Sequence, residues 1–223
     1  MSGRSLALVC TTLLLSTGCV TMGTFETAHT IGAGRTQWAL EPSYWGASGS
    51  GGGEYLPSAA VAIRYGISDS AELGARLGFN GIDLLTKFQL MGGRDQFTLS
   101  LAPSVGGVFL TGTSSGGIGM VQVPLLIGIP LGSSELVLSP KVHDLFVFAS
   151  DSGGSSVVQV LSVGAGVGLA LRLGDSFQLL PEVTVLKPMT GAAASNGSST
   201  EVSSLDNAGV LMQFGVGFLF GGR

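Results

Sequence analysis

The stretch from Ala208 to Phe220 alternates between two kinds of side chain. One face carries the larger apolar residues Val210, Met212, Phe214, Val216, Phe218 and Phe220, and the other carries Gly209, Leu211, Gln213, Gly215, Gly217 and Leu219. A period of two predicts a β-strand and not a helix. In a soluble sandwich the bulky face packs inward and the polar face meets water, whereas here bulk lies opposite glycine. This pattern favours a barrel strand whose apolar face contacts lipid.

The composition agrees with a membrane barrel and with neither default class. The chain has 37 glycines in 223 residues and only 11% charged residues, which is too apolar for an ordinary soluble domain and too rich in glycine for a helical membrane protein. The stretch from Gln96 to Ser134 has no charge, but Ser, Thr, Pro and Gly interrupt it, so no helix of about 20 apolar residues fits there. The net charge of −4 argues against a nucleic-acid partner.

The N-terminus has the pattern of a targeting segment. Arg4 precedes an apolar run from Leu6 to Leu15, and small residues follow before Cys19. This resembles a bacterial lipoprotein signal, which implies a signal peptide over residues 1–18 and lipidation of Cys19. Ordinary cleavage near Gly18, leaving Cys19 as a free thiol, is the alternative. The resemblance also implies transfer to the outer membrane, because lipoproteins retained at the inner membrane often carry Asp where this chain has Val20.

The rest of the chain divides into a lead segment and a predicted barrel. We expect residues 19–33 to form a periplasmic lead and residues 34–223 to form an all-β, antiparallel up-and-down transmembrane β-barrel of about ten strands, within a range of 8–12. A tilted strand needs roughly 9–11 residues to cross a bilayer. The predicted strands are Gly34–Trp45, Pro57–Gly66, Ser70–Phe79, Gly81–Met91, Gln96–Leu110, Gly117–Leu131, Ser134–Ala149, Ser155–Leu173, Ser176–Lys187 and Asn207–Gly221.

The connections between these strands alternate in length. Tight turns are predicted at Ile67–Asp69, Gly92–Asp95, Gly132–Ser133 and Gly174–Asp175. Longer Gly- and Ser-rich loops are predicted at Gly46–Leu56, Thr111–Gly116, Ser150–Gly154 and Pro188–Asp206, and only Asn80 breaks the alternation. Short periplasmic turns and longer outer loops are typical of outer-membrane barrels. An even number of strands places both termini on the periplasmic side.

Two short stretches resemble a known family. Tyr65–Gly74 resembles the strand-turn-strand of small, largely uncharacterised outer-membrane β-barrels of Gram-negative bacteria, and Thr27–Thr30 followed by Gly32–Trp38 is similar to their entry. The resemblance implies location in the cell outer membrane, with outer-membrane lipid and the barrel assembly machinery as partners. It also implies that Phe220 is the terminal aromatic assembly signal. The residues of the outer loops name no particular partner.

Charged residues fall on the face predicted to line the lumen. Facing lipid at mid-depth, an Arg or Lys costs about 2–4 kcal/mol. We expect Arg76 and Lys87 to cross the lumen to Glu41 and Glu182 and to close it. The predicted mid-height charge network comprises Glu41, Arg76, Lys87, Lys141 and Glu182, and Arg35, Arg64, Glu72 and Arg172 lie nearer the periplasmic rim. The simpler reading is that these charges only satisfy one another and have no transport role.

The sequence offers little for catalysis. His29 and His143 are the only histidines, and we expect His29 to lie in a polar periplasmic tail. Ser139 shares a strand face with His143, but Asp144 falls on the opposite face and cannot orient the imidazole without a bulge. We therefore expect no enzyme, no catalytic residue, no cofactor and no metal site.

Three functions remain open at this stage. The preferred one is an integral outer-membrane barrel with a structural or interaction role, or a very narrow pore largely closed by the charge network. An alternative is a lipid-tethered, lipocalin-like soluble barrel that binds a small apolar ligand, which predicts a charged outer face. A lipid A or peptide hydrolase is a lesser alternative.

Overall fold

The computed structural model describes residues 21–49, 52–78, 81–93, 96–110, 115–151, 154–195, 198–202 and 209–222. The predicted signal peptide and Cys19 lie outside these residues. None of them forms a helix long and apolar enough to cross a membrane. The strands are β1 (Thr36–Gly49), β2 (Gly52–Ser68), β3 (Ala71–Gly78), β4 (Gly81–Met91), β5 (Thr98–Leu101), β6 (Ser104–Leu110), β7 (Ser115–Leu131), β8 (Ser134–Asp151), β9 (Gly154–Arg172), β10 (Phe177–Ser195), β11 (Ser198–Val202) and β12 (Val210–Gly221).

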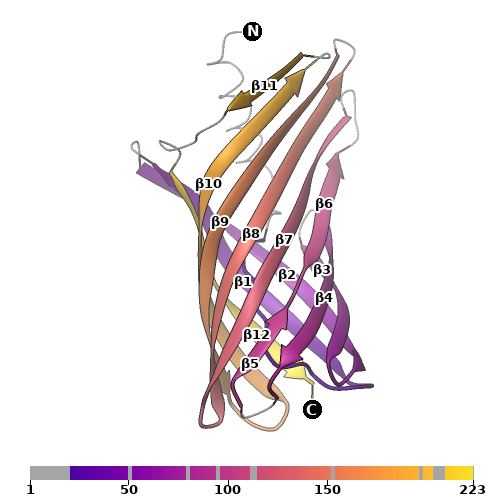
Figure 1. The fold of residues 1–223 in the computed structure, drawn as a ribbon, viewed down its shortest axis with the longest axis vertical. Coiled ribbons are helices and arrows are strands. Elements are labelled where there is room, and N and C mark those ends of the chain that lie inside the picture. The colour runs from indigo at the N-terminus through magenta and orange to yellow at the C-terminus, as the bar shows by residue number, and fades with distance from the viewer. Residues whose placement is uncertain are drawn as a thin grey trace.

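The strands close into one antiparallel barrel (Figure 1). β1 pairs with β2 and β12, and β10 pairs with both β9 and β12. β5 and β6 both lie between β4 and β7, so they are two parts of one strand interrupted at Ala102 and Pro103. β11 pairs only with the end of β10. The described residues therefore form a ten-stranded up-and-down barrel, as the sequence predicts.

The outer connections contain more strand than the sequence predicts. Within Gly46–Leu56, β1 continues to Gly49 and β2 begins at Gly52. Within Pro188–Asp206, β10 continues to Ser195 and pairs with β11. These Gly-, Ala- and Ser-rich stretches have low strand propensity, but each added residue extends an existing hydrogen-bonded ladder. The ladder decides the outcome, and the predicted loops are largely β-hairpins.

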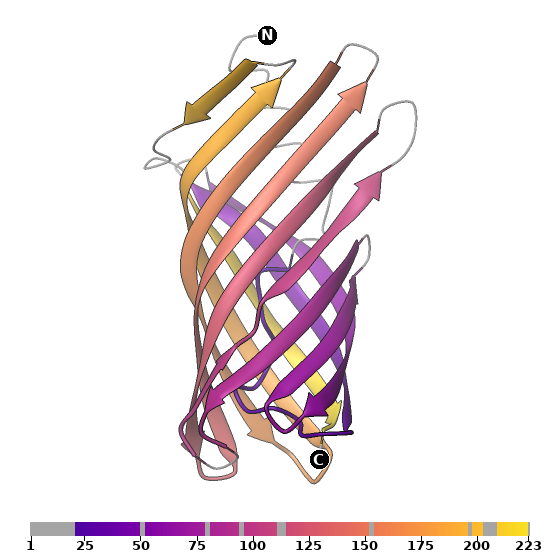
Figure 2. The same cartoon turned by 45° about the vertical axis from the view of Figure 1, so that its right-hand side comes forward.

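The barrel is much taller on one side than on the other. β7, β8, β9 and β10 have 17–19 residues, whereas β3 has 8 and β4 has 11. A rise of about 3.3 Å per residue and a tilt of about 40° give heights of roughly 48 Å for β9 and roughly 20 Å for β3. Figure 2 shows β7 to β10 standing above the β3–β4 edge. The outer parts of β7–β10 thus extend beyond that edge.

The apolar face of each strand points outward. On β12, Gln213 and Leu219 are each 1% exposed, whereas Phe214 and Phe220 are 44% and 47% exposed. Arg64, Arg76 and Lys87 are instead among the most deeply buried side chains of the described residues. A soluble barrel would turn its apolar face inward, so the lipocalin-like alternative is wrong.

Aromatic side chains gather at two levels of the outer surface. Near the turns, Phe177 and Phe220 have ring centroids 5.1 Å apart, and Trp38 pairs with Phe220 across the strands. Nearer the hairpins, Phe214 lies 5.5 Å from Tyr44 and 5.8 Å from Tyr55 between ring centroids. Such aromatic groups are typical of the two interfaces of a membrane-spanning barrel.

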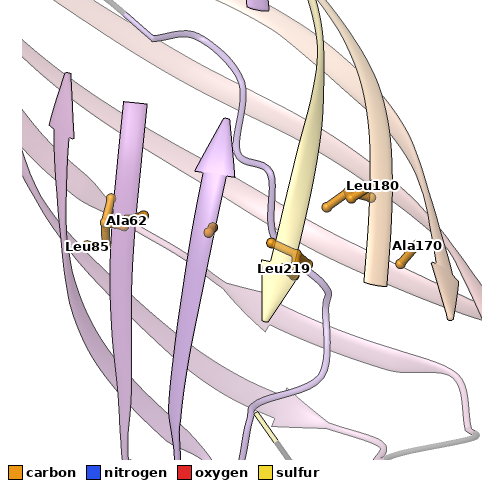
Figure 3. Close-up of a cluster of buried hydrophobic side chains, with 6 residues drawn as sticks. Ala62, Leu85, Ala170, Leu180 and Leu219 are labelled. Atoms are coloured by element: carbon orange, nitrogen blue, oxygen red, sulfur yellow. The ribbon is translucent and has the colours of Figure 1, made fainter. Parts of the chain in front are cut away.

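The lumen has an apolar layer near the turn end. This cluster is formed by inward side chains of β1, β2, β4, β9, β10 and β12 (Figure 3). Its members are Ala39, Ala62, Leu85, Ala170, Leu180 and Leu219. The alanines among them leave more room in the lumen than larger side chains would. That room is used by a segment of chain that belongs to no strand.

Candidate functional site

Residues 21–31 lie inside the barrel, and we call them the plug. All of them are buried except His29, which is half-buried. The expectation of a solvated polar tail is therefore wrong for these residues. The sequence of the plug has no strand or helix period, which made it resemble a solvated tail, but the lumen wall supplies partners for its backbone.

Side chains on the inner face of the barrel strands, which we call the wall, accept hydrogen bonds from the amide groups of the plug. Glu182 accepts from the amides of Thr24 and Phe25 at 2.8 and 2.7 Å. Gln213 binds the amides of Met22 and Gly23, Glu135 binds Ala28, Gln89 binds Thr30, and Glu72 binds Ile31. Buried amides need such partners because an unpaired one costs about 1–3 kcal/mol.

The wall also donates hydrogen bonds to the carbonyl groups of the plug. Lys141 Nζ donates to Met22 O at 2.8 Å, and Arg76 Nη2 donates to Thr24 O at 2.8 Å. Further donors are Arg64 to Phe25 O, Lys87 to Thr27 O and Ser100 to Ala28 O. Charged donors form stronger hydrogen bonds than neutral ones, so the four cations hold the plug backbone firmly.

The plug makes no backbone-to-backbone hydrogen bond with the described strands. The first such bonds along the chain belong to the following turn, where Gly34 N donates to Gly66 O and Arg35 N donates to Gly32 O. Wall side chains therefore take the role that a neighbouring strand takes in a sheet. The plug is a separate, irregular segment joined to the barrel through residues 32–35.

Phe25 anchors the plug in a pocket on β12. A Cβ added to Gly215 would lie 2.9 Å from the Phe25 ring, and one added to Gly217 would lie 3.4 Å from Phe25 Cβ. Phe25 is 1% exposed and has a φ of 47°, which is unusual for any residue except glycine. Strain of this kind persists only where the surroundings fix the conformation. The small residues of β12 provide the space for this ring.

Glu26 of the plug completes a buried charge network. Its carboxylate lies 3.3 Å from Arg64 Nε and 3.6 Å from Lys87 Nζ. Burial by itself raises the pKa of Glu26, but Arg64, Lys87 and Arg76 together outweigh burial and hold the pKa below its usual value. Glu26 therefore remains an anion between two wall cations.

The structure places the five residues of the predicted network in the lumen, with partly different contacts. Arg76 Nε lies 2.7 Å from Glu41, as expected. Lys87 does not reach Glu182; its Nζ lies 3.1 Å from Glu72 and 3.6 Å from Glu26. Lys141 lies 3.9 Å from Glu182. The physical reason is that the plug stands between the walls: Glu182 binds plug amides, and Glu26 supplies a carboxylate near Lys87.

Sequence analysis missed several members of this network. Arg64 bridges Glu26 and Glu41, with its Nη2 2.9 Å from Glu41, although it was expected nearer the rim. Asp83 on β4 lies 3.4 Å from Arg76 and was not considered. Asp83 shares the inner face of β4 with Lys87, from which it is four positions away, so the alternation of this strand is the signal that identifies it.

The histidines lie in different surroundings. His29 Nδ1 lies 2.8 Å from Glu135 Oε2, so it belongs to the plug and not to a free tail. His143 is 1% exposed, and within the described residues neither of its ring nitrogens has a hydrogen-bond partner. The carboxylate of Asp144 instead accepts a hydrogen bond from Gln159 at 2.8 Å. Among the residues that the structure describes, no carboxylate therefore orients the His143 imidazole.

A buried polar row crosses β6 to β9 at the level of His143. Strand pairing joins Ser104 to Gln122, Gln122 to His143 and His143 to Ser162. Each of the four has a buried atom without a hydrogen-bond partner among the described residues. No described group of three or more His, Cys, Asp or Glu could hold a metal ion.

Comparisons with known proteins find similar architecture but no family. No protein-family model and no curated protein matches the chain. Similar solved structures include the translocator domain of the autotransporter NalP from Neisseria meningitidis, at 13% identity and TM-score 0.48, covering 97% of this chain and 95% of that one. OprG from Pseudomonas aeruginosa has 13% identity and TM-score 0.40, covering 87% and 99%. The outer membrane protease OmpT from Escherichia coli has 10% identity and TM-score 0.38, covering 84% and 95%. At such identities the likeness concerns architecture, so the role must be inferred from this chain's own residues.

Proposed function

We propose that the chain is an integral outer-membrane β-barrel kept closed by its own N-terminal plug, with a structural or interaction role at the cell surface. The apolar outer band has the height that a bilayer needs. On β8 and β10 the outward residues Asp144 and Lys187 stand ten positions beyond Ser134 and Phe177, where these strands begin. Ten residues of tilted strand rise about 25 Å, which equals the usual apolar band of such barrels.

The main support for a closed barrel is that wall side chains form hydrogen bonds with the backbone of the plug. A ten-stranded barrel with glycine and alanine on its inner wall is too wide for its own side chains to fill. Here the plug occupies that space, and wall groups bind its amides and carbonyls from Met22 to Ile31. Opening a pore would leave four buried cations without these acceptors. A stable open pore is therefore not expected.

The orientation follows from the turns and from the direction of the plug. Tight turns face the periplasm in outer-membrane barrels, and β12 ends at Gly221 at the same end of the barrel as these turns (Figure 1), which supports a periplasmic C-terminus. The plug runs the other way: Met22 contacts Lys141, which is seven positions along β8 and about 18 Å above the turns. Cys19 is three residues upstream and reaches at most about 11 Å further. We therefore propose that the N-terminus leaves toward the cell surface, in place of the periplasmic position that strand parity alone suggests.

A conductance measurement tests the closed barrel. The refolded wild-type protein in planar bilayers should show no stable conductance, whereas Phe25→Ala combined with Glu26→Ala should open a pore, because it removes the anchor ring and the shared carboxylate. Leu77→Ala, on the outward face of β3, is the matched control and should stay closed. Stable nanosiemens-class openings of the wild type would refute the proposal.

An epitope tag tests the orientation. A tag placed between Val20 and Thr21 should be labelled by antibody on intact cells, and a tag after Arg223 should be labelled only after permeabilisation. Labelling of the first tag only in permeabilised cells would refute the proposed path.

Metabolic labelling with a palmitate analogue, compared with Cys19→Ser, tests lipidation separately. The assembly role of Phe220 stays a prediction, and Phe220→Ala should slow insertion.

A further inference from the structure

We infer that the lumen is a binding site for a peptide segment bearing a Phe-Glu pair, and that residues 21–31 occupy it as a resident ligand. The inference rests on the closed barrel proposed above and adds the ligand class. Most contacts between wall and plug involve the plug's main chain. Glu182, Gln213 and Glu72 accept from its amides, and Lys141, Arg76 and Lys87 donate to its carbonyls. Another peptide whose backbone turns in the same way at its Phe offers the same groups.

Two side chains give the site its preference. The Phe25 ring lies against Gly215, where an added Cβ would come within 2.9 Å of the ring, and Gly217 lies beside Phe25 Cβ. The next residue, Glu26, lies between Arg64 and Lys87. A Phe followed by an acidic residue is therefore the chemistry that this part of the wall recognises.

The plug is bound like a separate molecule. It shares no backbone hydrogen bond with the described strands, and its link to β1 crosses the exposed residues 33–36. The barrel closes without it, because β1 pairs with β12 on one side and with β2 on the other. The same contacts are available to a peptide supplied in trans.

Cutting the link in the folded full-length protein tests this. A protease recognition sequence is inserted between Ala33 and Gly34, and the protein is folded in detergent and then cut. The probe is a fluorescein-labelled synthetic peptide with the sequence of residues 21–33, followed by fluorescence anisotropy. The cut protein should bind the probe saturably, unlabelled peptide should compete, and uncut protein should not bind.

Variant peptides test the preference. A Phe25→Ala peptide should bind about 100-fold more weakly or worse, since a buried ring is lost. A Glu26→Gln peptide should lose about tenfold, because Arg64 retains Glu41 and Lys87 retains Glu72. Equal binding of all three peptides would overturn the proposed preference.

The remaining outcomes are also decisive. Heat-modifiable migration on gel electrophoresis reports whether the cut barrel stays folded. A folded cut barrel that loses its segment and does not bind the probe overturns the inference, and so does a segment that leaves only when the barrel unfolds. In either case the wild-type barrel can still be closed in planar bilayers, so failure here is distinguishable from failure of the proposed function. A cut barrel that falls apart equally contradicts a separable ligand.

Discussion

The ion pair between Glu26 and Arg64 joins the plug to the wall, and a double-mutant cycle measures that connection. Arg64→Met removes a buried cation between Glu26 and Glu41, and breaking buried pairs costs about 3–5 kcal/mol. The lower value, about 3 kcal/mol, applies because Glu41 keeps Arg76 and Glu26 keeps Lys87. Glu26→Gln should cost about 1.5 kcal/mol, as for one hydrogen bond to a charged group.

The double variant should be less damaged than the sum of the single variants. Once Glu26 has lost its charge, removing Arg64 no longer leaves a carboxylate short of a partner. We expect a total cost of about 3 kcal/mol where independent effects would give about 4.5 kcal/mol, so the coupling energy is about 1.5 kcal/mol. A coupling of this size requires Glu26 to be inside the barrel.

Tryptophan fluorescence during urea unfolding in lipid vesicles provides the measurement. Trp45 is buried against Met22 and Leu186, so it reports on the lumen beside the plug, and a Trp38→Phe background removes the signal of the outward tryptophan. Glu26→Gln combined with Val142→Ala, an outward change on β8, is the control and should be additive. Additivity of Glu26 and Arg64 within about 0.5 kcal/mol would refute the placement of the plug.

Three further predictions concern the lumen. Gly217→Leu should displace the plug, because the added side chain enters the space of Phe25, and protease cleavage at Phe25 should become faster with the barrel still folded; unchanged cleavage would contradict the pocket. Plug docking should weaken as the pH falls below about 4.5. Docking lowers the pKa of Glu26 from its ordinary value of 4.5, so the ionised carboxylate stabilises the docked state at higher pH, and this stabilisation is lost as Glu26 becomes protonated. Arg64, Lys87 and Arg76 face Glu26, and these cations also contact Glu41 and Glu72. A Glu26→Gln variant measured by Trp45 fluorescence therefore separates the share of Glu26; the same acid response in that variant would exclude Glu26 as the cause. His143→Leu should leave the free energy of unfolding unchanged or raise it, because the ring nitrogens have no described partners, and a loss above about 2 kcal/mol would show that they have one.

The barrel itself could be predicted from the sequence because its pattern repeats along every strand. Alternation sets which side chains face outward, and Gly-Asp-Ser turns set where each strand reverses. Phe214 and Phe220 therefore point outward and Arg76 and Lys87 inward as expected. The outer hairpins were underestimated because pairing with a neighbour outweighs the low strand propensity of residues such as Gly191 and Ala192.

The plug could not be predicted because its binding leaves almost no pattern in its own sequence. Glu182 accepts hydrogen bonds from its backbone and Lys141 donates one to it, and every residue type except proline has the same amide and carbonyl. Two weak signals were present. The inner face of β12 lacks bulk at Gly215 and Gly217, and Phe25 is a large aromatic residue in a segment that was expected to be a polar tail.

A plug of this kind also explains why so many charges stand inside one narrow barrel. Burying a lone cation is far costlier than burying one with acceptors, and carboxylates alone cannot surround four cations without repelling one another. Peptide carbonyls have no net charge and accept strong hydrogen bonds from Lys141, Arg76 and Lys87. An extended segment supplies a carbonyl or an amide at each step along the lumen, so it satisfies both signs of charge at once. The charges of the wall and the backbone of the plug are thus complementary, and loss of the plug should leave Lys141, Arg76 and Lys87 without their uncharged acceptors.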